Sequence, residues 1–573
     1  MTAVETRPRA AAGQAGAWAR RERARRWAAY VAAGLGIVGL LSALSRPLRG
    51  RVAALLELMP IVVPRTAVLT LVFVSVALVL TARGLRRGHR LAWMAAEGLM
   101  VASVVLHLTK GLDVEEALLA AAGAVWLATQ HRAFPVLPTR VAARRAAVAA
   151  AGGAVVVLGV SLALAAQARR GGVRELDDLV GVVVRDLTGQ GPPMTVLHLH
   201  FTGTVLAAAG AALLASVAWL LLSPRQPEPL VGEAHRRERE RARAVVTRYG
   251  GDTLDFFALR DDKQWFFTGR SVVAHAVRGT VCLVSPDPIG PAEEREDVWA
   301  EFMAYAESCG WSVAVVGAAP DWLPLYEASG LRSVYLGDEG VVDCQTFTLN
   351  GHEMQSVRRA HRRVGAAGYT VTFHDPAHLD DATRQALLAL SEQGRRGGEE
   401  RGFSMTLSRL FDPADAGVLV AVARDPMGRP AAFIQWVPAP RLPGWSLDVM
   451  RRGTAQMPNG VIDFLIVETI RHVRELGGTA LGLNFAVWRR IVAGEQDATA
   501  GGRLARRVLR RASASAQIES LWRFNAKYAP RWVPRYAAVG TVDVLAAQGV
   551  AIAGAEGVTD VPVIGRLVAR SGS

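Results

Sequence analysis

The distribution of apolar residues divides the chain into two halves. Long runs of Ala, Val and Leu dominate the first 225 residues, whereas the remainder alternates short apolar runs with polar and charged stretches. A helix needs about 20 mainly apolar residues to cross a bilayer, so the first half is predicted to be a polytopic α-helical membrane domain of about six spans. The candidate spans are residues 28–45, 61–82, 91–109, 114–129, 146–167 and 200–222. The fourth is short and begins with Glu115 and Glu116, so five spans are the alternative.

Arginine-rich segments predict the orientation of this domain. Residues 1–27 carry seven Arg, and the segments 83–90 and 140–145 are also rich in Arg, whereas residues 110–116 are net acidic. Cytoplasmic loops carry an excess of Lys and Arg, so residues 1–27 are predicted to be a basic cytoplasmic tail. An even number of spans across residues 28–223 then returns the chain to the cytoplasm. The arginines of residues 46–51 and 168–199 are exceptions to this assignment.

A charged junction follows the apolar half. Residues 224–249 contain many Arg and Glu residues, and we interpret them as a helical linker whose cations lie against anionic lipid headgroups. Binding of nucleic acid by this run is the alternative.

The second half has the pattern of an α/β protein. Strands are predicted at 264–267, 279–285, 311–316 and 340–347, with a helix at 293–309. The pattern starts again after residue 375 with a helix and further strands. Two related domains are therefore predicted, residues 250–375 and 376–545, followed by a C-terminal tail at 546–573.

The segment from Trp445 to Arg489 is a candidate for chemistry. Large apolar residues alternate with Ser446 and Asp448, which predicts a strand with one polar face. A turn at Pro458-Asn459-Gly460 precedes a predicted helix, and a second short strand surrounds Gly482. Asp448 and Arg451 thus belong to the first strand of a predicted strand–turn–helix–strand unit. A surface ion pair between them is the alternative.

Composition and motifs exclude several function classes. The net charge of +15 and the pI near 10.6 favour polyanionic partners, either nucleic acid or an anionic membrane surface. The three cysteines lie far apart without metal-ligand spacing, so no metal site is expected. The sequence contains no P-loop, no GxGxxG after a predicted strand, no HExxH or GxSxG motif, and no loop that would hold a coenzyme A pyrophosphate. No cofactor is therefore expected.

A basic helix is predicted around residues 356–364. Arg358 and Arg362 share one face, and Arg359 and Arg363 share another. Like charges at this spacing repel one another, so an anionic partner such as a phosphate would stabilise the cluster. A solvated basic helix is the alternative.

Residues 517–536 interleave aromatic residues with cations. This mixture suits a phosphate-bearing or amphipathic ligand, or a segment that closes a site. Packing of the aromatic side chains is the alternative.

Taken in order, these motifs resemble the aminoacyl-phosphatidylglycerol synthases, also called phosphatidylglycerol lysyltransferases or multiple peptide resistance factors. The similarity spans roughly residues 245–540. The matching pieces are Asp287-Pro-Ile-Gly-Pro291, Leu323-Pro-Leu-Tyr326, Val342-Asp343, Phe347-Thr-Leu, Val357-Arg358-Arg359, Asp448-Val-Met-Arg451, Pro458-Asn459-Gly460-Val-Ile-Asp463-Phe, Leu483-Asn484-Phe-Ala and Arg523-Phe-Asn-Ala-Lys527-Tyr.

The resemblance implies two tandem acetyltransferase-like (GNAT) folds that transfer an amino acid from aminoacyl-tRNA to phosphatidylglycerol. Lysine is the amino acid expected. It also implies a multi-pass cell-membrane protein with a cytoplasmic catalytic domain, possible homo-oligomers, and a cationic lipid product that protects against cationic antimicrobial peptides. The N-terminal half resembles the shorter membrane region of actinobacterial members, around Leu106 to Leu119. This chain carries no fused lysyl-tRNA synthetase, so we expect a separate synthetase, and its few spans argue against lipid flipping.

The same resemblance places Asp448, Arg451 and Lys527 on positions associated with activity. Asp448 is expected to activate the lipid hydroxyl or to hold the α-ammonium group, and Arg451 to bind the lipid phosphate. Lys527 is expected to stabilise the oxyanion or to contact a tRNA phosphate. The expected substrate-binding residues are Arg358, Arg359, Arg362, Arg363, Asn459, Asn484 and Arg523.

Two alternatives remain open at this point. The same fold could transfer to another lipid or small acceptor, or the protein could be a transporter or scaffold that binds anionic lipid without catalysis. Transport sites use ionisable pairs inside the membrane, and the spans carry none that is evident. His107, His198 and His200 lie at span edges and are interpreted as interfacial.

Overall fold

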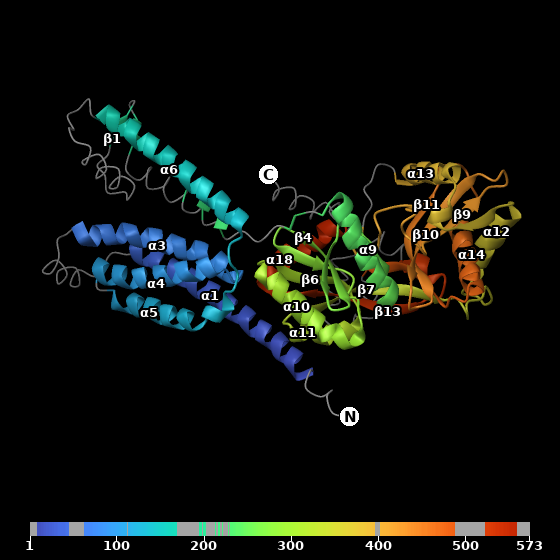
Figure 1. The fold of residues 1–573 in the computed structure, drawn as a ribbon, viewed down its shortest axis with the longest axis horizontal. Helices are drawn as coiled ribbons and strands as arrows, with labels where there is room; N and C mark the ends of the chain where they lie inside the picture. Colours follow the sequence, from blue (N-terminus) through green and yellow to red (C-terminus); the bar gives the residue numbers. More distant parts are fainter. Residues whose placement is uncertain are drawn as a thin grey trace. The chain divides into compact units, whose positions relative to one another are not determined.

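The computed structural model describes residues 8–44, 62–111, 113–168, 230–395, 402–487 and 522–557, with short pieces between 194 and 228. The chain divides into two compact units. One comprises residues 17–225 with 305–311, and the other comprises residues 1–16, 226–304 and 312–573. The first is mainly helical and the second is built on a large sheet (Figure 1).

The helical unit consists of long apolar helices with small residues at their contacts. Ala28, Ala32, Ala96 and Ala124 are buried between helices, where they let the backbones approach closely. The helices are α1 (Pro8–Leu44), α3 (Val62–Arg86), α4 (Arg90–Gly111), α5 (Val114–Thr129) and α6 (Arg140–Ala168), with a 3-10 turn η1 (His131–Ala133). Helix α1 begins within the predicted tail. Short strands β1 (Met194–Val196) and β2 (Leu199–Phe201) pair with each other.

Two described helices are long and apolar enough to cross a membrane, at Trp18–Ala43 and Arg90–Thr109. Helices cover the first five predicted segments, but most of residues 200–222 lies outside the described residues. The count of six spans and the orientation therefore stay predictions.

The second unit contains one sheet of 11 strands. Strands β5 and β6 pair in parallel, as do β11 and β12, and the other neighbours are antiparallel. In spatial order the strands are β3 (Gln264–Thr268), β4 (Ser271–Arg278), β5 (Val281–Val284), β6 (Ser312–Ala318), β13 (Arg531–Val539), β7 (Arg332–Asp343), β12 (Ala480–Val487), β11 (Gly444–Arg452), β10 (Pro430–Ala439), β9 (Leu419–Arg424) and β8 (Thr370–His374).

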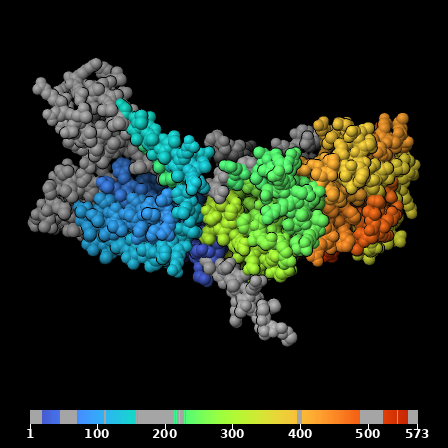
Figure 2. Space-filling model, viewed as in Figure 1, coloured from blue at the N-terminus to red at the C-terminus, as the bar shows by residue number. Residues whose placement is uncertain are grey.

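The ten strands from β3 to β9 form two halves with the same strand order, one read inward from β3 and the other inward from β9, and β8 is an additional edge strand. β3, β4, β5 and β6 correspond to β9, β10, β11 and β12, and a helix connects the parallel pair in each half. The last strand of each half is exchanged, because β7 pairs with β12 and β13 pairs with β6. The second unit is thus a repeated α/β structure in which each half completes the other, and the two halves form a continuous surface in Figure 2.

Helices cover both faces of this sheet. Along β9, Val420 and Val422 enter one core while Leu419 and Ala421 enter the other, because successive side chains of a strand point to opposite faces. The first core, with α9 and α13, is called the α13 face here; the second, with α14 and Val357 of α12, is called the α14 face. The helices are α9 (Gly232–Tyr249), α10 (Arg295–Ser308), α11 (Leu323–Ala328), α12 (Gln355–Ala366), α13 (Asp381–Arg395), α14 (Val461–Glu475) and α18 (Val542–Ala555), with 3-10 turns η3 (Asp255–Leu259), η4 (Ala292–Glu294), η5 (Pro320–Trp322) and η6 (Pro376–His378).

The predicted linker contributes helix α9 to the α13 face. Ala242 and Val246 of α9 are fully buried there. Arg239 donates to the Leu259 carbonyl at 2.8 Å and to the Asp415 carboxylate at 2.8 Å. These residues therefore pack as part of the α/β unit.

Candidate active site

The turn before α14 brings α12 and α14 together. Gly460 precedes the helix with a φ of 101°, which glycine adopts without strain. A Cβ atom at Gly460 would lie 2.6 Å from the Cβ of Ala360, so a side chain there would also push α12 away. This close approach places the arginines of α12 beside the N-terminus of α14.

The arginine cluster divides between two flanks of α12. Arg358 is half-buried and donates to the carbonyls of Leu349 and Gly351, the latter at 3.0 Å. Arg363 is exposed and donates to the Asn459 carbonyl at 3.3 Å. Arg359 and Arg362 are exposed as well. Arg358 therefore supports a loop, while the other three arginines form an open basic surface.

Lys527 belongs to a small polar group at the start of α14. Its Nζ lies 3.3 Å from Oδ1 of Asp463, which also accepts a hydrogen bond of 2.6 Å from the Tyr528 hydroxyl. The Nζ also lies 4.8 Å from the ring centre of Phe524. Burial, together with the neighbouring Asp463 carboxylate, raises the pKa of Tyr528 well above its usual value. Tyr528 is therefore a neutral donor, and Lys527 is a partly exposed cation beside it. Arg523 lies exposed on the preceding turn.

A cleft of about 810 Å³ begins next to this group. It is lined by the end of β7 and the loop up to Met354 on one side and by Tyr528, Ala529 and Arg531 on the other. A volume of this size is within the range of small-ligand sites. The loop that Arg358 supports forms part of the wall of this cleft.

Asp448 lies on the α13 face of the sheet. It is the extra residue of a β-bulge, because Gln435 pairs with Val449 and Trp436 pairs with Leu447. The side chain is buried, and its oxygens accept hydrogen bonds from the Leu407 backbone at 2.8 Å and from the Gln435 amide at 2.7 Å. Arg451 projects to the same face, because it pairs with Phe433, whose ring is buried there.

The structure does not bring all the predicted catalytic residues together on one face. Asp448 and Arg451 lie on the α13 face, whereas Lys527 and the basic helix lie on the α14 face. Strands β11 and β12 pair only from Gly444–Ala480 to Ser446–Gly482, although both continue beyond these residues. Asp448 on β11 and Asn484 on β12 follow this last pair, so the two strands do not pair with each other at their level. The side chain of Asn484 is outside the described residues.

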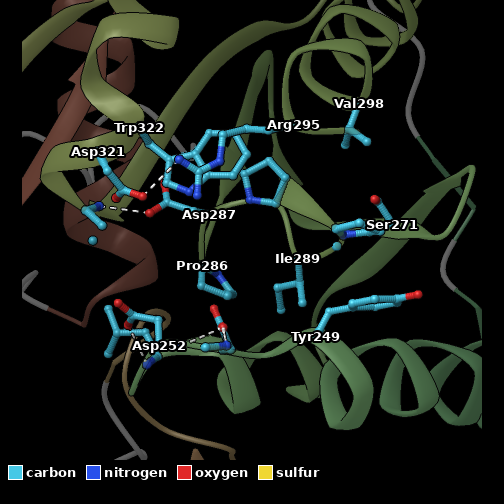
Figure 3. A pocket seen from close by; sticks show the side chains of 18 of the residues that line it. Tyr249, Asp252, Ser271, Pro286, Asp287, Ile289, Arg295, Val298, Asp321 and Trp322 are labelled. Atoms are coloured by element: carbon cyan, nitrogen blue, oxygen red, sulfur yellow. Dashed lines mark hydrogen bonds and ion pairs between the residues drawn. The ribbon is translucent and has the colours of Figure 1, made fainter. Parts of the chain in front are cut away.

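A second cavity lies in the first half of the sheet and is called the acidic cavity here, after the carboxylates in its lining. It has a volume of about 220 Å³ and lies where β5 ends, at the Asp287-Pro-Ile-Gly-Pro291 motif. Figure 3 shows Asp252 and Asp287 on its wall. Asp252 pairs with Arg535 at 2.7 Å, and Asp287 accepts from the Ala319 backbone at 2.8 Å and from the Tyr326 hydroxyl. Burial raises the pKa of Asp287 to about 7. Arg295 and Arg535 line the cavity as well, so positive side chains already stand beside its carboxylates.

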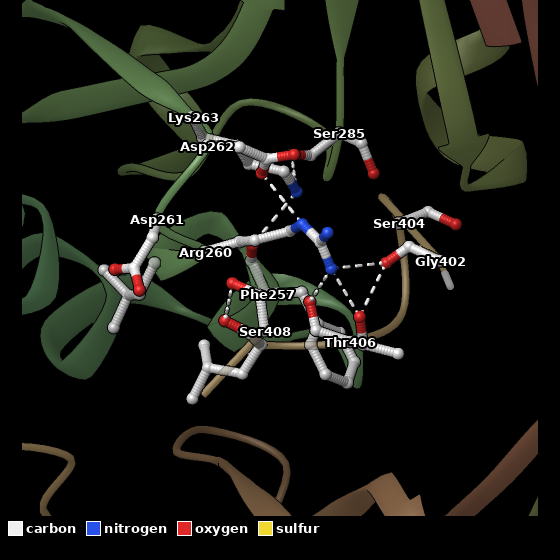
Figure 4. Close-up of polar contacts among 12 residues, drawn as sticks. Phe257, Arg260, Asp261, Asp262, Lys263, Ser285, Gly402, Ser404, Thr406 and Ser408 are labelled. Carbon is white, nitrogen blue, oxygen red and sulfur yellow. Dashed lines mark hydrogen bonds and ion pairs between the residues drawn. The ribbon is translucent and has the colours of Figure 1, made fainter. Parts of the chain in front are cut away.

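A buried lysine and the neighbouring Arg260 lie against the loop at 402–408 (Figure 4). Lys263 donates to the Phe257 carbonyl at 2.9 Å and to the Ser285 carbonyl at 2.7 Å, and its Nζ lies 4.5 Å from the ring centre of Phe403. Arg260 donates to the carbonyls of Gly402 and Thr406 at 2.9 and 3.1 Å. These bonds fix the loop at 402–408, whose Leu407 in turn binds Asp448.

Comparison with known proteins gives a family for the α/β unit. The sequence profile described as "Phosphatidylglycerol lysyltransferase, C-terminal" matches residues 243–539, which is more than half of the chain. The chain belongs to this family. The resemblance deduced from the sequence motifs is therefore confirmed, and the family is one of aminoacyltransferases.

Among curated proteins, the α/β unit is similar to the "Lysylphosphatidylglycerol biosynthesis bifunctional protein LysX" of several mycobacteria. The Mycobacterium tuberculosis H37Rv protein is 36% identical over 370 residues, covering 63% of this chain and 31% of that protein. The Mycobacterium marinum protein is 37% identical over 358 residues, covering 61% and 32%. The chain thus spans about a third of the length of these relatives. The solved structure "L-PGS from Bacillus licheniformis" is 24% identical, with a TM-score of 0.47 over 56% of this chain and 96% of that chain.

Some residues of this candidate site were missed in the sequence analysis. Asp463 and Tyr528 stood in quoted motifs, but nothing in their spacing indicated that they would meet around Lys527. The acidic cavity was missed because Asp252 and Arg535 are far apart in the sequence. The Asp287 motif was the one signal that pointed to it.

Proposed function

We propose that the protein is a membrane-bound aminoacyltransferase that moves lysine from aminoacyl-tRNA to a glycerol hydroxyl of phosphatidylglycerol. The observation that carries this proposal is the family match across residues 243–539. The helices long and apolar enough to cross a membrane support a site close to its lipid substrate. In this proposal the α/β unit is cytoplasmic, where aminoacyl-tRNA is available.

The reaction is an exchange of esters. The bond between the lysyl carbonyl carbon and the tRNA ribose oxygen breaks, and a bond to the glycerol oxygen forms. The proton of the glycerol hydroxyl ends on the ribose oxygen. The enzyme therefore has to orient the hydroxyl and stabilise the negative charge on the tetrahedral intermediate.

The residues around α14 suit that task. Lys527 supplies a positive charge for the oxyanion, and Asp463, which also accepts a hydrogen bond from Tyr528, holds its ammonium group in place. Arg359, Arg362 and Arg363 offer an open basic surface for tRNA phosphates, while the adjoining cleft receives the acceptor.

The residues on the α13 face take supporting parts in this proposal. Both oxygens of Asp448 accept hydrogen bonds from the protein, so Asp448 positions the loop at 402–408 beside the site. Arg451 lies on the α13 face as well, away from the cleft, so the proposal gives it no contact with the lipid phosphate there.

A lipid-labelling experiment tests the proposal. Membranes containing the protein are incubated with phosphatidylglycerol, total tRNA, synthetases and one labelled amino acid at a time, with and without ribonuclease. We expect a lysine-labelled lipid that ribonuclease abolishes. Labelling of another lipid would instead support a different acceptor, and the absence of any labelled product with active synthetases would contradict the proposal.

The biological consequence follows from the charge of the product. Lysyl-phosphatidylglycerol carries a net positive charge, so it lowers the attraction of the membrane for cationic antimicrobial peptides. Resistance to such peptides is therefore part of the proposal.

A further inference from the structure

Three metal-ligating side chains meet where α4 ends and α5 begins. His107 belongs to α4, Asp113 immediately precedes α5, and Glu116 lies in the first turn of α5. One ligand atom from each, a ring nitrogen or a carboxylate oxygen, lies within 4.8 Å of the other two. The spacing His-x5-Asp-x2-Glu matches none of the motifs sought in the sequence analysis, so only the turn between the helices reveals the group.

His107 faces the interior of the helical unit. Ala96, Met100, Ser103 and His107 are all buried, at intervals that place them on one side of α4, and His107 is only 2% exposed. The sequence analysis interpreted His107 as interfacial, whereas the structure directs it toward the other helices. An ionisable side chain directed inward in a membrane domain is a candidate functional residue.

Asp113 is not used as a helix cap. Aspartate is a preferred residue at this position because its carboxylate can accept from the free backbone N–H groups of the first turn. The Asp113 side chain makes no such bond. The Ser42 hydroxyl on α1 instead lies 3.5 Å from its Oδ2, and the Asp113 backbone donates to the His107 carbonyl at 3.2 Å. The connection between the helices is thus held closed with the carboxylate near the imidazole.

We propose that His107, Asp113 and Glu116 bind a divalent cation of the zinc class. Zinc takes imidazole and carboxylate ligands at about 2.0–2.2 Å, and three protein ligands leave a position for water. Ligand atoms around such an ion lie roughly 3.5 Å apart, so the three side chains need to move inward by about 1 Å. Mg²⁺ and Ca²⁺ prefer sites made only of oxygen, which disfavours them here.

The charges and connections of the site agree with this class of ion. Two carboxylates supply the charge that a divalent cation neutralises, and a neutral imidazole supplies the nitrogen. The ion would join α4 to α5, with Ser42 supporting Asp113 from α1. It would therefore stabilise the helical unit, independently of the transferase reaction proposed for the other unit.

Zinc content tests the proposal in the full-length protein. Purified protein in detergent is stripped with EDTA, dialysed against Zn²⁺ with excess Mg²⁺, and analysed by elemental mass spectrometry. We expect the wild type to retain one more Zn²⁺ per chain than His107→Gln or Asp113→Asn. His131→Gln is the control, because His131 is an exposed histidine of the same unit outside the cluster, and it should retain the wild-type content.

A spectroscopic measurement covers variants that fail to fold. Co²⁺ added to the stripped wild type should give visible absorption bands of a mixed nitrogen and oxygen site, and Glu116→Gln on the helix surface should weaken them. Equal zinc content in the wild type and His107→Gln, or a wild type without bound zinc and without cobalt bands, would overturn the proposal. In that case His107 and the carboxylates would be interpreted as an ion pair.

Discussion

At the scale of single residues, the candidate site depends on charges held by neighbouring groups. Lys527 lies beside a cleft that the adjacent Tyr528 and Arg531 line. Asp463 positions it, because this carboxylate accepts a hydrogen bond from Lys527 and another from Tyr528. The resemblance in the sequence identified Lys527, but no local pattern identified its partners. Asp463 and Tyr528 are far apart in the sequence, so their contact arises only when the chain folds.

Replacing Lys527 with methionine should remove the charge and keep most of the packing. We expect lysyl transfer to fall roughly 10²-fold or more, which is the usual cost of losing a group that stabilises an oxyanion. Lys527→Arg serves as the control and should retain part of the activity. The measurement is the initial rate of lipid labelling, and an unchanged rate in Lys527→Met would exclude this role.

Asp448 should affect stability as well as activity. Asp448→Asn turns an amide donor toward Leu407 or Gln435, both of which donate to the carboxylate in the wild type. We expect the free energy of unfolding to fall by about 1–3 kcal/mol, the cost of leaving a buried polar group unsatisfied. Chemical denaturation of the isolated α/β unit measures it. An unchanged free energy with lost transfer would instead support direct catalysis by Asp448.

The pKa of Asp287 predicts a dependence of stability on pH. Burial raises this pKa to about 7 from an ordinary value of 3.8, so the folded state keeps a proton that the unfolded state loses. Stability should therefore fall as the pH rises from about 4 to 7 and stay level above 7. Asp287→Asn should flatten this slope in thermal unfolding, and an identical slope in both proteins would contradict the assignment.

At the scale of elements, the sheet is organised by the exchange of β7 and β13. The sequence analysis predicted two successive α/β domains from the recurrence of strands and helices. The exchange could not be predicted, because the hydrophobic pattern of a strand does not specify which neighbour it pairs with. The same limit applied to Asp448, whose place in a bulge depends on the register between β10 and β11.

The exchange predicts that neither half of the sheet folds well alone. A fragment ending at residue 375 lacks β13, which lies between β6 and β7, so unpaired strand edges would be exposed. We expect fragments 226–375 and 376–573 to aggregate when expressed separately and to co-purify when expressed together. Size-exclusion chromatography measures this, and a monomeric, cooperatively unfolding first fragment would contradict the prediction.

At the scale of the whole molecule, the sequence predicted the fold class of each half, helical or α/β, better than the pairing of its strands. Long apolar runs indicated the helical unit, and ordered motifs indicated the α/β unit and its family. The net charge of +15 agrees with polyanionic substrates such as tRNA and an anionic lipid. The count of spans stays a prediction, because residues 200–222 lie largely outside the described chain.

The central claim is lysyl transfer from tRNA to phosphatidylglycerol, and a single-turnover reaction tests it most directly. Purified protein in excess is mixed with preloaded lysyl-tRNA and phosphatidylglycerol vesicles, without any synthetase, and the lipids are analysed by mass spectrometry. The account predicts lysyl-phosphatidylglycerol in an amount equal to the lysyl-tRNA consumed. Release of free lysine without a lipid product, or lysyl-tRNA that remains intact, would contradict it.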